Sequence, residues 1–330
     1  MKIALIADAL TSNSLEPEAD VWHLTPQNAK IVLKLWKPDM LFVESAWQGH
    51  KNRWKYKIAA YTKHKKRHNK KLISLVAYAK KLGIPTIFWN KEDGVHFDRF
   101  IESAKHFEYI FTVDENCIPK YKNIVEKNVS VNTLMFAVQP SIHHFTGFHF
   151  TSSYANFIGS YSKHIHPERK KWQDMIFEAS CEAGVGLEVW DRNSSRKSSD
   201  YRYPQSPCMK IHKSIDYIHT EKVYKKYSIS LNVNTIVDSP TMFSRRLIEI
   251  LACGGIVVTN NALSVEKYFK DYCYVVSSKQ EALEVLSKLK DGANEIDLKR
   301  AEAGAAYVAK EHTWKHRLEQ ICKVVGLDNA

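Results

Sequence analysis

The chain has 330 residues, 44% of them hydrophobic and 12% aromatic, with a formal net charge of +12 and a pI of about 9.2. This length favours two domains, and this apolar content excludes a disordered chain. No stretch approaches the ~18 consecutive apolar residues of a membrane-spanning helix. We expect the opening MKIALIADAL to be a first β-strand and not a secretory signal, because its short apolar run meets an aspartate.

In the first half, short apolar runs alternate with segments of helical periodicity, which predicts a parallel, doubly wound α/β sheet. The expected strands are Lys2–Ala9, Met40–Val43, Ile84–Trp89 and Tyr109–Val113. The expected helices are Asn28–Trp36, Trp54–Lys66, Leu72–Leu82 and Phe97–Ala104. Polar residues follow several strands, at the edge where open α/β sheets bind ligands.

The rhythm breaks over Phe136–Ser153, which has the composition of a linker, and then resumes. We therefore predict domains at residues 1–145 and 146–330. The expected strands are Ala155–Ser160, Gly186–Trp190, Ser228–Val233, Ile256–Val258 and Cys273–Val276. The expected helices are Trp172–Ala183, part of Ser214–Tyr227, Lys279–Leu289 and a long terminal Ile296–Val325.

The six cysteines are scattered without a CxxC pair, which argues against a zinc site. We interpret them as reduced core residues of a cytoplasmic protein. They are Cys117, Cys181, Cys208, Cys253, Cys273 and Cys322.

The segment Ser239–Asn260 combines a loop, a helix, a Gly-Gly stop and a buried strand. Gly254 and Gly255 end the helix, since glycine enters the left-handed region at little cost. The free N–H groups of the helix start and the adjacent Arg245 and Arg246 suit a diphosphate. The alternative is an ordinary αβ unit with a solvated arginine pair.

The run RRLIEILACGG from Arg245 to Gly255 resembles the donor-site segment of nucleotide-sugar glycosyltransferases with the GT-B architecture, in which two Rossmann-like domains face each other across a cleft. The likeness is to the group named after the spore maturation protein CgeB, and FVESAWQG, IPTIFWNKEDGVHF and YIFTVDENC resemble the amino-terminal half of that group. The resemblance implies an acceptor-binding first domain and a donor-binding second domain. It also implies a terminal helix, about residues 300–326, that packs back toward the first domain.

Related retaining enzymes carry a Glu-x7-Glu motif at this place. Its second Glu matches Glu249, but its first falls at Thr241, so the chain departs from the pattern. In those relatives the first Glu contacts the donor sugar. The departure leaves the donor sugar and the stereochemical outcome open, with retention favoured over inversion.

Glycosyl transfer requires a stabilised leaving diphosphate, which GT-B enzymes usually provide with cations and helix-terminal amides and without a metal. The donor is expected to be a UDP- or GDP-linked sugar, with no other cofactor. The assigned residues are Arg245, Arg246 and the backbone of Thr241, Met242 and Phe243 for the diphosphate, Gly159 and Ser160 facing it, Glu249 for the ribose, and Arg192 and Tyr217 beside the base.

An inverting enzyme also needs a general base to take the acceptor proton, whereas a retaining one of this architecture often uses the donor phosphate. Asp93 ranks first because several polar groups gather in NKED, Glu92 and His96 follow, and Glu44 is a further candidate. Trp47 follows a polar strand end and is a candidate for stacking on a sugar.

The positive charge is concentrated between Ser45 and Lys91, where no Asp or Glu occurs. Such a surface attracts anionic partners: an inner-leaflet membrane, an anionic glycan or lipid-linked acceptor, or nucleic acid. The core of this basic segment is Lys51–Lys71, in which Trp54, Tyr56 and Tyr61 lie among the cations.

The histidine pairs lack the carboxylates or cysteines of a metal site, and no Gly-x-Gly-x-x-Gly or Walker sequence occurs, which argues against a dehydrogenase or an ATPase. We expect a cytoplasmic glycosyltransferase, peripheral at the inner membrane face, that builds a surface polysaccharide or similar polymer. The alternatives are a DNA-modifying glycosyltransferase and a non-catalytic basic binding protein on the same scaffold.

Overall fold

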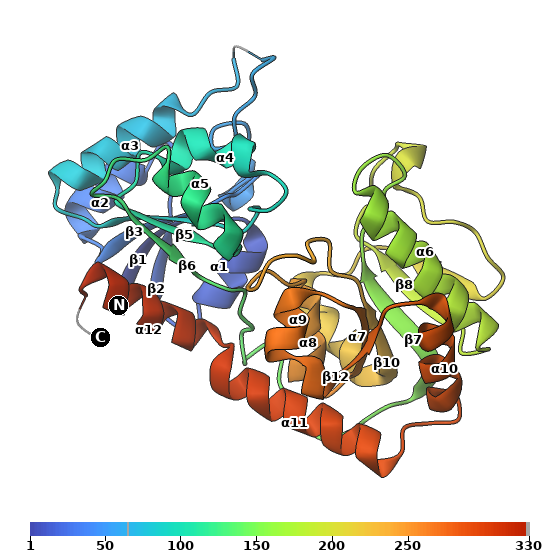
Figure 1. Cartoon of the computed structure of the whole chain (residues 1–330). Helices are drawn as coiled ribbons and strands as arrows, with labels where there is room; N and C mark the ends of the chain where they lie inside the picture. Colours follow the sequence, from blue (N-terminus) through green and yellow to red (C-terminus); the bar gives the residue numbers. More distant parts are fainter. Residues whose placement is uncertain (65, 328–330) are drawn as a thin grey trace. The chain divides into compact units, whose positions relative to one another are not determined.

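The structure is a computed structural model that describes residues 1–64 and 66–327. In it the chain divides into two compact units (Figure 1). Among the described residues, unit 1 comprises 1–139, 239–242 and 314–327, and unit 2 comprises 140–238 and 243–313. The first crossing lies at 139/140, inside the stretch whose composition indicates a linker.

Unit 1 is built on a six-stranded, all-parallel sheet with the strand order β2-β1-β3-β4-β5-β6. The direction of winding reverses between β1 and β3, which creates a switch point at the carboxyl ends of those two strands. The strands are β1 Lys2–Ile6, β2 Asp20–His23, β3 Met40–Glu44, β4 Thr86–Asn90, β5 Tyr109–Thr112 and β6 Ser130–Thr133.

Helices cover both faces of this sheet, so its central strands are apolar on both sides (Figure 1). In β1, Ala4 and Ile6 pack in one core while Ile3 and Leu5 pack in the other, with Trp314. The first core receives α2 Ala29–Trp36, α3 Lys70–Lys81, α4 Phe97–Ala104 and α5 Ile118–Lys122, and the second receives α1 Ala9–Leu15 and α12 Trp314–Val325.

Unit 2 contains a second six-stranded parallel sheet, with the order β12-β11-β10-β7-β8-β9. Here the winding reverses between β7 and β10, as in dinucleotide-binding sheets. The strands are β7 Ser152–Gly159, β8 Leu187–Asp191, β9 Met209–His212, β10 Tyr227–Asn232, β11 Ile256–Asn260 and β12 Cys273–Val276.

One face of the second sheet packs against two helices, α6 Pro167–Glu182 and α10 Lys279–Leu289. The remaining helices of unit 2 are α7 Thr220–Lys226, α8 Arg245–Ala252, α9 Leu263–Tyr268 and α11 Glu295–Glu311. The expected single helix over Ile296–Val325 is therefore two helices, interrupted at His312-Thr313, and the second of them, α12, belongs to unit 1. There it packs Trp314 edge-on against Trp89, with ring centroids 5.2 Å apart.

The helix predicted over Trp54–Lys66 is wrong. A short 3-10 turn at His50–Asn52 precedes the segment, which itself consists of turns and bends, and Lys65 lies outside the described residues. Two contacts hold the chain in this irregular course: Asp8 accepts hydrogen bonds from the amides of residues 47–49, and the buried Trp54 indole donates to Leu24 O at 2.8 Å. The lysines supply no apolar stripe that would hold a helix against the sheet.

The reduced state predicted for all six cysteines is also wrong, because Cys181 and Cys208 form a disulfide. It joins α6 to the stretch just before β9, which the fold brings together with Cα atoms 5.6 Å apart. The other cysteines are free and buried. Since disulfides persist mainly in oxidising compartments, the cysteines no longer support a cytoplasmic location. In the described part of the chain, no helix has the length and apolarity to span a membrane.

Candidate functional site

The switch point of unit 2 holds a buried cation, Arg246. Its Nε donates to Ile158 O at the end of β7 (2.7 Å), and its guanidinium also donates to Asn232 Oδ1 at the end of β10 (3.2 Å). The guanidinium lies over the Phe157 ring at 4.1 Å. Burial lowers the pKa of Arg246 to about 10, so it remains charged at neutral pH. Arg246 therefore bridges the two strands between which an open α/β sheet binds its ligand.

Arg169, which sequence reasoning missed, joins this cation. It lies in the first turn of α6 and donates to Ser160 O at 2.9 Å, and its buried Nε has no partner in the structure. A Cβ added at Gly159 would lie 3.1 Å from the Arg246 guanidinium and 2.4 Å from the Phe157 ring. The strand end must therefore be a glycine for the guanidinium to reach it.

Arg192 is the third member of what we call the arginine cluster, Arg169, Arg192 and Arg246. It is an exposed residue directly after β8, and its backbone amide donates to Gly159 O at 2.9 Å. Burial lowers the pKa values of Arg169 and Arg246, and repulsion from neighbouring guanidiniums lowers both further. Within the described chain, neither Arg169 nor Arg246 forms an ion pair with a carboxylate. Arg169 and Arg246 thus bring positive charge together without a carboxylate to neutralise it, which is what an anion site requires.

Arg245 does not join this cluster but pairs within its own helix. Its Nε lies 3.2 Å from Glu249 Oε1, and its guanidinium stacks over the Tyr217 ring at 5.0 Å. Glu249 is buried and accepts a hydrogen bond from Tyr224 at 3.3 Å. The expected site residues therefore form two groups, one around Arg246 and one around Glu249.

The residues chosen for backbone amides lie elsewhere. Helix α8 begins at Arg245, so Thr241, Met242 and Phe243 precede it. The amides of Thr241 and Met242 already donate to Ser239 Oγ, and the Thr241 hydroxyl donates to Val113 O within unit 1. Phe243 is buried against Phe269. These contacts favour a structural role for all three.

In unit 1, Glu44 lies fully buried at the switch point between β1 and β3. Lys91 forms an ion pair with it and also approaches Asp8 at 4.0 Å. Burial raises the pKa of Glu44, and the Lys91 charge opposes that rise. Unlike Arg169 and Arg246, the buried Glu44 therefore has an ion-pair partner within its own unit.

Asp93, the first-ranked candidate base, is fully buried. Its carboxyl group accepts hydrogen bonds from Asn90 at 2.6 Å and from the Tyr121 hydroxyl at 2.9 Å. Burial raises the pKa of Asp93 to about 7. This carboxyl group therefore lies in the interior of unit 1, with its oxygens hydrogen-bonded to Asn90 and Tyr121.

Glu92 and His96 are the candidate bases that reach the surface of unit 1. They follow β4, and Trp47 contacts the His96 ring edge-on with centroids 5.3 Å apart. Burial lowers the pKa of His96, while the nearby Glu92 opposes that shift. His96 is thus neutral near pH 7 and able to accept a proton.

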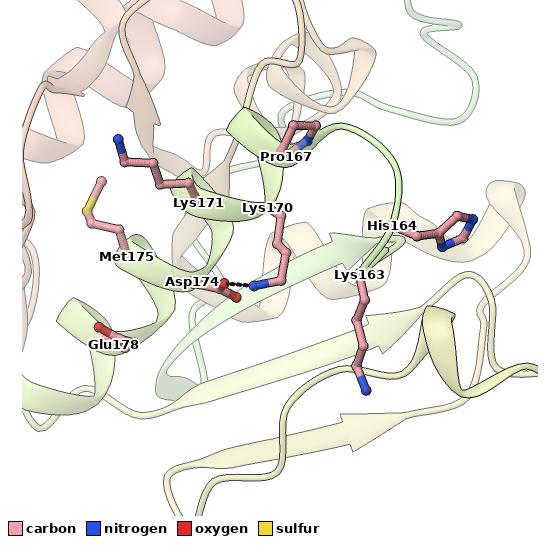
Figure 2. A pocket seen from close by; sticks show the side chains of 8 residues that line it. All are labelled: Lys163, His164, Pro167, Lys170, Lys171, Asp174, Met175 and Glu178. Carbon is pink, nitrogen blue, oxygen red and sulfur yellow. Dashed lines mark hydrogen bonds and ion pairs between the residues drawn. The ribbon is translucent and has the colours of Figure 1, made fainter.

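Figure 2 shows a separate open pocket on unit 2, formed by α6 and the loop that precedes it. Its lining includes an ion pair between Lys170 and Asp174, and Tyr161 donates to the other oxygen of Asp174 at 2.6 Å. Lys170, which is next to Arg169 in the sequence, is therefore neutralised by Asp174, whereas Arg169 has no carboxylate partner among the described residues. No group of three or more His, Cys, Asp or Glu side chains in the described residues is placed to hold a metal ion.

Residues 170–323, a little under half of the chain, match the family model described as "Glycosyl transferase-like". This stretch runs from α6 to α12 and includes Arg192, Arg246 and Glu249. The protein is a glycosyltransferase by this match. No curated protein matches the chain.

Several solved structures share the fold along nearly the whole chain. An alpha-glucosyltransferase in complex with UDP and a 13-mer DNA has a TM-score of 0.66 at 10% identity, covering 98% of this chain and 99% of its own. T4 phage BGT in complex with UDP-glucose has a TM-score of 0.62 at 12% sequence identity, and the match covers 100% of both chains. Anabaena Alr3699/HepE in complex with UDP and glucose has a TM-score of 0.58 at 10% sequence identity, and the match covers 98% of this chain and 91% of that one. At these identities the likeness establishes the GT-B fold alone.

The buried state of Asp93 predicts an unusual pH dependence. Its pKa rises from 3.8 in the unfolded chain to about 7 in the fold, so the unfolded state loses the proton first and stability falls as pH rises between these values. Asp93→Asn should therefore stabilise the protein at pH 8 relative to wild type, by up to about 4 kcal/mol, and have a smaller effect at pH 4. Urea unfolding at both pH values measures this, with the exposed Asp98→Asn as control. A variant equally destabilised at both values would contradict the assignment.

Proposed function

We propose that the protein transfers a sugar from a UDP- or GDP-linked donor to a hydroxyl of an anionic glycan or lipid-linked acceptor. The observation that carries this proposal is the arginine cluster, in which the buried Arg246 and the half-buried Arg169, whose Nε is buried, have no carboxylate partner among the described residues. A nucleoside diphosphate supplies the missing negative charge. The UDP complexes of fold neighbours support the same class of donor.

In this reaction the acceptor oxygen forms a bond to the anomeric carbon. The bond from that carbon to the diphosphate breaks, and its electron pair goes to the leaving diphosphate. Arg169, Arg192 and Arg246 stabilise the charge that develops there, and their positive charge allows the reaction without a metal ion. Placement of the chain in the CgeB-like group is part of the proposal and rests on the Arg245–Gly255 segment.

Removing one guanidinium should weaken donor binding. Arg169→Gln is expected to lower the affinity for UDP or GDP about 10- to 100-fold, because charge-assisted hydrogen bonds contribute about 1.5–3 kcal/mol. Arg196→Gln is the matched control, since Arg196 is exposed in the loop after β8 and stacks on Tyr201. Calorimetric titration of both variants measures the difference. Unchanged affinity of folded Arg169→Gln would remove the cluster from the donor site.

The reaction is proposed to retain the anomeric configuration, with the leaving phosphate taking the acceptor proton. Burial of Glu44 and Asp93 supports this, because it removes two of the four candidate bases that an inverting enzyme would need, and only Glu92 and His96 of the four reach the surface. Under retention these two residues position the acceptor, beside Trp47.

His96→Ala is accordingly expected to lower kcat by less than about tenfold, since a true general base contributes about 10²–10⁴-fold. His106→Ala is the control, because His106 is a half-buried histidine elsewhere in unit 1. Product NMR should show the donor's anomeric configuration. An inverted product together with a loss of 100-fold or more in His96→Ala would establish inversion with His96 as base.

The acceptor is proposed to meet the basic segment, which would also hold the protein to the cytoplasmic face of a membrane. The cations Lys51, Arg53, Lys55, Lys63 and Lys66 are exposed in the structure, whereas Trp54 is buried and provides no binding surface. DNA modification is the second candidate function, because this same segment suits a phosphate backbone and a fold neighbour is described in complex with DNA.

The two candidates differ in which polyanion the segment binds. The main proposal expects binding to phosphatidylglycerol vesicles that weakens with salt and is lost in K51E/R53E/K55E. K80E/K81E, at the end of α3, is the control because it changes exposed charge outside Lys51–Lys71. Sedimentation with vesicles and titration with duplex DNA measure both. Transfer of sugar to duplex DNA would instead establish the second candidate.

A further inference from the structure

His143 is a buried titratable residue that the proposed reaction does not use. It lies in the connection that leads into β7 and is 1% exposed. Its ring contacts the rings of Tyr217 and Tyr224, with centroids 5.2 and 6.0 Å away. Burial lowers the pKa of His143 to about 4, so the ring is neutral at physiological pH.

The hydrogen bonds of His143 fix which ring nitrogen carries the proton. His143 Nε2 lies 2.8 Å from the Thr220 hydroxyl oxygen, and that hydroxyl donates its one proton to Tyr217 O at 2.8 Å. The hydroxyl therefore accepts from Nε2–H. In a neutral imidazole this leaves Nδ1 as an acceptor.

That acceptor has no partner. Nδ1 of His143 is buried and has no hydrogen-bond partner in the structure, and the same holds for an Nη atom of Arg245. Oε1 of Glu249 is also buried and has only its ion pair with Arg245 Nε, at 3.2 Å. The charges of Glu249 and Arg245 both act on His143, as do those of Glu221 and Lys225. One buried acceptor, His143 Nδ1, and one buried donor of Arg245 thus lie unsatisfied in unit 2, and each carries a desolvation cost. The carboxylate of Glu249 can accept further hydrogen bonds beside its ion pair.

We infer that His143 accepts a hydrogen bond from a ribose hydroxyl of the donor nucleotide, so that the site selects ribonucleotides over deoxyribonucleotides. This inference rests on the proposed function. A vicinal diol matches the unsatisfied set, because each hydroxyl donates one hydrogen bond and accepts others. Glu249 and His143 Nδ1 accept from the diol, and Arg245 donates to it.

The ribose reaches these atoms only when the stacked Arg245 and Tyr217 side chains move apart, since they cover the group in this structure. Arg245 is the part-exposed member, with a side-chain exposure of 19% against 4% for Glu249. Its displacement opens the region. The same nucleotide that occupies the arginine cluster through its diphosphate then satisfies the buried acceptors through its sugar.

The test is calorimetric titration of wild type with UDP, GDP and the 2′-deoxy and 3′-deoxy forms of each. For the nucleotide that binds, loss of the hydroxyl that pairs with His143 should weaken binding about tenfold or more, because a buried acceptor stays unpaired. In His143→Phe that analogue should bind within about twofold of the parent nucleotide. His143→Asn should restore part of the preference, since its side-chain oxygen offers an acceptor near the position of Nδ1.

His144→Phe is the matched control, because His144 is the exposed neighbour in the same connection, and it should keep the wild-type preference. Imidazole nitrogen NMR of wild type provides a measurement that does not depend on a variant's folding: the Nδ1 resonance should shift with the ribonucleotide and not with the critical deoxy analogue. Equal affinity of wild type for all sugars, an unchanged Nδ1 resonance, or a preference retained in folded His143→Phe would overturn the inference and indicate a buried water instead. Absence of binding by UDP and GDP alike would overturn the proposed function as well.

Discussion

Unit 2 of this protein is organised around a guanidinium, that of Arg246, held inside the protein without a carboxylate partner. The Arg246 side chain donates hydrogen bonds to Ile158 O and Asn232 Oδ1, at the ends of the two strands that flank the switch point. Its guanidinium lies over the face of the Phe157 ring. These contacts hold the cation in place but do not neutralise it. A buried, uncompensated charge is costly, and a nearby second arginine adds repulsion. An anionic ligand relieves both, which links the fold's stability to its proposed chemistry.

The two units share a single reversal of winding in a parallel sheet, but the charges at their switch points differ. Each sheet reverses its winding once and gathers polar residues where the strands diverge. In unit 1 the buried Glu44 is balanced by Lys91, and Asp8 is occupied by the amides of residues 47–49. In unit 2, Arg169 and Arg246 have no carboxylate partner among the described residues. An unbalanced positive site suits a diphosphate, whereas a balanced one suits a neutral hydroxyl that must be positioned and not strongly bound.

The sequence predicts the buried parts of the fold well, because apolar periodicity records burial on both faces. It misses β2, β6 and β9, which lie at or near the sheet edges and mix polar with apolar residues. It identifies Arg246 from the helix pattern but cannot separate it from Arg245, since neighbouring helix positions point about 100° apart and only the fold shows which faces the strands. Arg169 was missed because the helix was expected to begin at Trp172, although Pro167 marks its true first turn. His143 gave no signal, because its neighbours Thr220 and Glu249 are distant in sequence.

The most direct test of this account is a crystal structure of the protein soaked with UDP or GDP. The account predicts diphosphate density against the guanidiniums of Arg169 and Arg246, at the carboxyl ends of β7 and β10. A nucleotide ordered elsewhere, with both guanidiniums in their present contacts and no anion beside them, would contradict it.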